Sequence, residues 1–76
     1  MMTDAERKQR YEVITESWKL MNNTMKNLPK TDSDFQRFVS DVYALYERFG
    51  KTEFSKDILV AVQCEIDRII KNQEEK

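Results

Sequence analysis

Apolar residues in the first third of the chain recur at steps of three and four positions. That spacing is typical of a heptad seam along one face of a helix. The seam consists of Tyr11, Ile14, Trp18, Met21, Met25 and Leu28. Thr3 followed by Glu6 can form a capping box at the start, and Pro29 disfavours a helical conformation for the residue before it. The pattern predicts a helix over residues 4–27 with this seam in the core.

A second apolar stripe follows and is the most regular in the chain. All of its members fall within about 60° of Val42 on a helical wheel. The stripe comprises Phe35, Phe38, Val39, Val42, Leu45, Tyr46 and Phe49. Thr31 or Asp32 can cap the start, and Gly50 stands where a helix often ends in a left-handed residue. We expect a helix over residues 33–49.

The third stripe is wider and covers about half of the helix circumference. It contains Phe54, Ile58, Leu59, Ala61, Val62, Ile66, Ile69 and Ile70. Thr52 can cap this helix, which we expect over residues 53–71. A face of this width contacts two neighbours, so this helix is the expected centre of a three-helix bundle. Residues 72–76 are polar and are predicted to form a frayed tail.

The breaks between the stripes are short, which favours antiparallel packing of successive helices. The chain of 76 residues contains one Gly and one Pro, and both fall in these breaks. There is no linker or internal repeat. The sequence therefore predicts an all-α fold, a three-helix bundle with short loops, as a single domain over residues 1–76. A chain of this length buries only about 60% of its unfolded surface, so its core is small.

The charge is balanced, with 13 basic and 14 acidic residues and a net charge of −1. Proteins that bind nucleic acid usually concentrate cations on one face. The best candidate contacts lie on the first helix, interspersed with acids: Arg7, Lys8, Arg10, Lys19 and Lys26. The junction at Gly50 superficially matches a helix-turn-helix, but Tyr46 stands where that motif needs a small residue. A small nucleic-acid-binding regulator is therefore the alternative hypothesis, and not the leading one.

Residues for catalysis and ligand binding are scarce. The chain has no His and one Cys, Cys64, which excludes a Ser-His-Asp or Cys-His arrangement within one chain and a Cys/His zinc site. A single Gly cannot build a phosphate-binding loop. We expect a protein that is not an enzyme and that has no cofactor, metal or small-molecule substrate.

The same features bear on the compartment. A lone cysteine cannot form an internal disulfide, whereas small secreted domains usually carry several. The first eight residues have no apolar stretch behind their charges, unlike a signal peptide. The longest apolar run, Ile58–Val62, is far shorter than the ~20 residues of a membrane span. We expect a cytoplasmic protein without membrane contact.

Several apolar residues fall outside the predicted core. Val13 and Leu20 lie a heptad apart on the predicted back of the first helix. Val60 and Cys64 lie four residues apart on the predicted back of the third. The first helix also outreaches the second by about 12 Å, which leaves Tyr11 without an intramolecular partner. Because small domains often gain stability by oligomerisation, we predict that these five residues belong to a homodimer interface.

Glu65 stands within the apolar face of the third helix, beside Ile58 and Ile69. Two interpretations are open. The carboxylate lies at the edge of a groove with its head in water, or it is a buried charge paired across the bundle. The candidate partners in the second case are Arg10, Tyr11, Tyr43 and Tyr46.

The stripe of Trp18, Met21 and Met25 also has two interpretations. Methionine and aromatic side chains together can form an adaptable groove for a partner protein. At helical spacing, however, such a stripe more often belongs to the core, and that is the prediction adopted for this chain.

The segment Tyr46–Leu59, YERFGKTEFSKDIL, with Trp18 upstream, resembles small uncharacterised helical proteins of clostridial and related Gram-positive bacteria. Many of these are carried on prophages and other mobile elements. The resemblance covers about the last two-thirds of the chain. It implies a short, standalone cytoplasmic protein without known enzymatic activity, and it carries over no functional residue.

Together these observations favour a non-catalytic protein–protein interaction module that pairs with itself. A mobile-element inhibitor that binds a host protein complex is a further alternative, which the sequence does not separate from the first.

Overall fold

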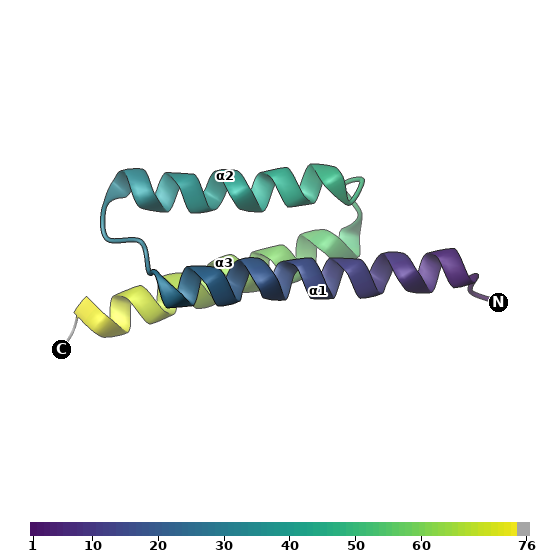
Figure 1. Cartoon of the computed structure of the whole chain (residues 1–76), viewed down its shortest axis with the longest axis horizontal. Helices are drawn as coiled ribbons and strands as arrows, with labels where there is room; N and C mark the ends of the chain where they lie inside the picture. The colour runs from purple at the N-terminus through teal and green to yellow at the C-terminus, as the bar shows by residue number, and fades with distance from the viewer. Residues whose placement is uncertain (75–76) are drawn as a thin grey trace.

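The computed structural model describes residues 1–74 and contains three helices (Figure 1). They are α1 (Asp4–Lys26), α2 (Asp32–Arg48) and α3 (Glu53–Glu74). The all-α three-helix bundle is confirmed, and both ends of α1 and α2 agree with the predicted ranges to within one residue. Helix α3 continues three residues beyond position 71, so residues 72–74 of the predicted tail are helical. The rest of that tail, residues 75–76, lies outside the described residues.

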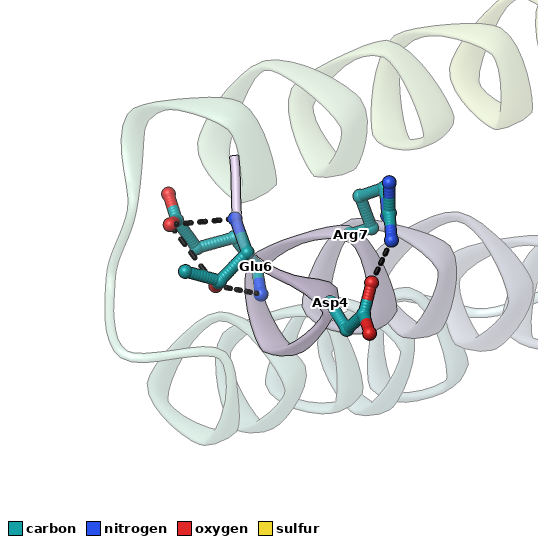
Figure 2. A network of polar contacts seen from close by, with 4 residues as sticks. Asp4, Glu6 and Arg7 are labelled. Atoms are coloured by element: carbon teal, nitrogen blue, oxygen red, sulfur yellow. Dashed lines mark hydrogen bonds and ion pairs between the residues drawn. The ribbon is translucent and has the colours of Figure 1, made fainter. Parts of the chain in front are cut away.

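Local capping fixes where α1 and α2 begin. The Glu6 N–H donates to Thr3 Oγ1 at 3.1 Å, and the Thr3 N–H donates to Glu6 Oε1 at 3.2 Å, which completes the predicted capping box (Figure 2). These hydrogen bonds from the Thr3 backbone and hydroxyl favour the ionised carboxylate and lower the pKa of Glu6. At the start of α2 the cap is Thr31, whose hydroxyl accepts from the Asp34 N–H at 3.1 Å.

The connection between α2 and α3 is a tight left-handed turn. Gly50 has a φ of +77° and Lys51 a φ of +56°. The Lys51 N–H donates to the Tyr46 carbonyl at 3.0 Å, and the Gly50 N–H donates to the Glu47 carbonyl at 3.1 Å. This pair of bonds is a Schellman motif. Thr52 then caps α3 by accepting from the Ser55 N–H at 3.2 Å, so the chain reverses direction within a few residues.

The three helices are staggered rather than flush. Helices α1 and α3 run in the same direction, and α2 runs antiparallel to both (Figure 1). The N-terminal turns of α1 extend beyond the α2–α3 connection, and residues 1–12 are all exposed. The molecule measures 49 × 20 × 18 Å with a radius of gyration of 13.8 Å, against about 11.4 Å for a compact chain of this length.

All three helices contribute to a small core. Its buried apolar residues are Val13, Phe38, Val42, Phe49, Leu59, Val62 and Ile66. Two serines are also fully buried, Ser17 on α1 and Ser55 on α3. Helix α2 therefore buries the apolar stripe predicted around Val42. Helix α3 packs against both other helices, as expected from its wide apolar face.

Helix α1 is rotated relative to the prediction. Its buried residues are Val13 and Ser17, and their direction lies about a quarter turn from the centre of the predicted seam. The placement of Val13 and Leu20 on the back of this helix was therefore wrong: Val13 is 1% exposed, and Leu20 packs against the core. These residues form a second, narrower seam with Ser17 and Thr24. Its short hydroxyl side chains fit between closely packed helices, and the Thr24 hydroxyl is satisfied by the Leu20 carbonyl at 2.8 Å.

Candidate functional site

The rotation of α1 leaves a row of large apolar side chains on the surface. Tyr11, Ile14 and Trp18, here called the α1 stripe, are 69%, 53% and 54% exposed. Their spacing of three and four residues places them on one face of the helix. The prediction that Ile14 and Trp18 lie in the core was therefore wrong. Met21 and Met25 continue the same line and are partly buried against the core.

Beside the stripe, an open groove of about 450 Å³ runs between α1 and α3. It is called the α1–α3 groove below. Its walls are formed by Ile14, Ser17, Trp18 and Met21 from α1 and by Ile58, Ala61, Val62, Glu65 and Arg68 from α3. Ser17 lies on the α1 side and is 1% exposed, and its Oγ has no hydrogen-bond partner. A buried hydroxyl without a partner is uncommon, because it loses its bonds to water without replacement.

Each of the two helices that form this surface carries an ion pair. On α1, Asp4 and Arg7 pair one turn before the stripe begins (Figure 2). On α3, Arg68 Nη1 lies 2.9 Å from Glu65 Oε1. All four side chains are well exposed, the least exposed being Glu65 at 41%. The surface formed by the α1 stripe and the α1–α3 groove therefore has an apolar middle, with the Asp4–Arg7 pair near one end and the Glu65–Arg68 pair near the other.

Glu65 is not a buried charge. Its partner is Arg68 on the same helix, and none of the cross-bundle partners considered from the sequence bonds to it. Arg10, one of those candidates, donates instead to the Glu6 carbonyl at 2.9 Å. The structure supports the interpretation of a carboxylate at the edge of a groove.

The five predicted interface residues do not form one surface. Tyr11 belongs to the α1 stripe, whereas Val13 and Leu20 are covered by the bundle itself. Val60, at 50% exposure, lines a separate groove between α2 and α3 with Tyr43 and Tyr46. The Cys64 thiol is exposed on α3.

The total exposed area is large for the mass. The chain exposes 5883 Å², about 1,000 Å² more than the roughly 4,900 Å² expected for a compact monomer of 9.1 kDa. The elongated shape, 49 × 20 × 18 Å, and the exposed α1 stripe both contribute to this excess. One partner in a standard protein–protein interface loses about 800 Å², so the excess is of the size that one side of an interface covers.

The described residues offer few other sites. Within residues 1–74, no three His, Cys, Asp or Glu side chains lie close enough together to hold a metal ion. None of the three helices, over that same range, combines the length and apolar character needed to cross a bilayer. Two of the cations on α1 face acids on the same helix, Arg7 with Asp4 and Lys19 with Glu16.

Comparison of the chain with protein-family models, with curated proteins and with solved structures finds no match.

Proposed function

We propose that the protein is a non-catalytic interaction module that forms a homodimer through the α1 stripe and works in the cytoplasm. The observation that carries this proposal is the stripe itself. Two aromatic residues and an isoleucine, all more than half exposed, stand in a row on one helix. Tyr and Trp are enriched in interfaces and among the residues that dominate binding energy.

The area of the stripe supports an interface of ordinary size. Its three side chains expose on the order of 350 Å², which is nearly half of what one partner contributes to a standard interface. The adjoining groove supplies further apolar area from Ile58 and Ala61. A chain with a small core gains stability by covering such a surface with a second copy.

The absence of ordinary catalytic groups also favours binding over catalysis. The sequence has no His and a single Cys, and Cys64 lies apart from both the stripe and the groove that adjoins it. The relationship to mobile-element proteins of Gram-positive bacteria, suggested by residues 46–59, stays a prediction.

Sedimentation velocity across a dilution series tests the proposal. We expect a species of about 18 kDa, twice the 9.1 kDa of the chain, at about 100 μM and dissociation on dilution. Trp18→Lys is expected to give a monomer with unchanged helical circular dichroism, because Trp18 is 54% exposed and is not needed for the core.

Tyr43→Lys provides the matched control. Tyr43 is an aromatic residue of similar exposure, 62%, on α2 and outside the stripe. It should leave the dimer intact. A wild-type chain that is monomeric at every concentration, or a Trp18→Lys chain that pairs as well as the wild type, contradicts the proposal.

A further inference from the structure

We infer that the second copy packs on the α1–α3 groove with the two α1 helices antiparallel, about a two-fold axis beside Ile14. This inference rests on the proposed self-association and adds to it the arrangement of the two copies. It follows from two features of the surface: the position of the stripe along α1, and the order of charges at its ends.

The position of the stripe sets the axis. A two-fold interface uses the same patch on both copies, so overlap is greatest when the axis passes through the middle of the patch. The exposed stripe runs from Tyr11 to Trp18, and its middle residue is Ile14. In antiparallel helices centred there, residues whose numbers sum to about 28 lie level with each other, because both helices rise 1.5 Å per residue.

This arrangement brings Tyr11 of one copy level with Ser17 and Trp18 of the other. The ring then enters the α1–α3 groove, whose α1 side contains Ser17. The contact would bury an aromatic ring that is 69% exposed in the single chain.

The charges favour the antiparallel direction. Arg7 comes level with Met21 of the second copy, which lines the groove together with Glu65. Helices α1 and α3 run in parallel, so Arg68, three residues after Glu65, lies about one turn further along, level with Asp4 of the first copy. Each acid thus approaches a base: Arg7 meets Glu65, and Asp4 meets Arg68.

A parallel pairing has the opposite result. It would set Arg7 beside Arg7 and Glu65 beside Glu65, and like charges across an interface are unfavourable. The overhang of α1 gives a second argument for the antiparallel arrangement. Its first turns extend past the end of their own bundle (Figure 1), and in the antiparallel dimer they lie across the groove of the other copy.

A charge-reversal cycle on the full chain tests the arrangement, with the dimer dissociation constant measured by sedimentation. Arg7→Glu and Glu65→Arg should each weaken pairing about tenfold, because a two-fold dimer contains the contact twice. The R7E/E65R chain should pair within about threefold of the wild type, because the two reversed charges attract again. Fraying of the first turn by Arg7→Glu would also affect the double variant, so it cannot produce this recovery.

Lys8→Glu is the matched control, since it makes the same charge change one residue along on an exposed position away from the stripe. It should change the dissociation constant by less than about twofold. If the losses from Arg7→Glu and Glu65→Arg instead add in the double variant, or if Arg7→Glu strengthens pairing, the antiparallel arrangement is wrong.

These outcomes are separate from failure of the proposed function. A chain that does not pair, or that pairs despite Trp18→Lys, contradicts self-association through the stripe. A chain that pairs through Trp18 but shows no charge coupling retains the proposed function and loses only the arrangement inferred above.

Discussion

Two fully buried serines provide a direct test of the packing. Ser17 and Ser55 are 1% and 0% exposed, but their hydroxyls differ in hydrogen bonding. The Ser17 oxygen has no partner. The Ser55 hydroxyl donates to the Thr52 carbonyl at 2.9 Å and accepts from the Thr52 hydroxyl at 2.9 Å. Replacement by alanine removes the same atom from both sites, so the two variants should change stability in opposite directions.

The expected magnitudes follow from these bonds. Ser17→Ala removes an unsatisfied buried group, which costs about 1–3 kcal/mol, and alanine is the better helix former by about 0.5 kcal/mol. The net effect should be a stabilisation of about 1–2 kcal/mol. Ser55→Ala breaks two hydrogen bonds and leaves the Thr52 groups without their partner, so it should destabilise the chain by about 1 kcal/mol.

The assay is urea unfolding followed by circular dichroism, with the chain dilute enough to be monomeric. Dilution matters because pairing would add its own free energy to the measured stability. In a domain of this size, 1 kcal/mol corresponds to about 4–8 °C in the melting temperature, so both shifts are measurable by heating as well. A loss of stability in Ser17→Ala of the same size as in Ser55→Ala would refute the assignment of Ser17 as an unsatisfied group.

Three further predictions concern other parts of the molecule. Val13→Ala should lower the free energy of unfolding by about 2 kcal/mol, because Val13 is 1% exposed. Trp18→Ala should change it by less than about 1 kcal/mol, because Trp18 is 54% exposed. Chemical denaturation compares the two variants, and equal losses would contradict the rotation of α1. Gly50→Ala should lower the free energy of unfolding by about 1 kcal/mol, as measured by thermal melting, because Gly50 has a φ of +77°. A new Cβ there would meet nothing within 4 Å, so this loss comes from backbone conformation and not from a clash. The capping box should weaken in acid, because the pKa of Glu6 is lowered in the folded chain. The contribution of the Glu6 carboxylate to folding stability is complete above the usual pKa of 4.5, and it is lost as the pH falls through the folded pKa. Glu6→Gln should remove that part of the acid dependence of the melting temperature, and an unchanged pH profile in this variant would contradict a role for the carboxylate.

The bundle could be predicted because its helix ends depend on local signals. The Thr3 and Glu6 capping box involves residues three apart. The turn after α2 places a glycine, Gly50, at the helix end where φ is positive, and Lys51 follows with a positive φ as well. Neither depends on knowing where the other helices lie. The α2 face could be predicted for a related reason, since only one apolar stripe occurs on that helix.

The rotation of α1 could not be predicted from hydrophobicity, because two seams compete on the same helix. The seam through Ile14 and Trp18 is the more apolar, whereas the seam through Val13 and Ser17 has the smaller side chains. The choice depends on how closely the helices approach one another, and a list of hydrophobic positions does not contain that distance. Glu65 is different, because an arginine three residues later was a visible partner.

The stagger of the bundle has a consequence for local stability. The first hydrogen bond from α1 to another helix or its cap comes from Gln9, which donates to the Phe49 carbonyl at 3.5 Å. The turns before it depend on the cap and on the Asp4–Arg7 pair, and so short a helical segment is marginal in water. Its amide protons should therefore exchange with solvent far faster than those of the core. If pairing covers this segment, the exchange rate of residues 4–8 will fall as protein concentration rises, so the end of α1 reports how much of the protein is paired.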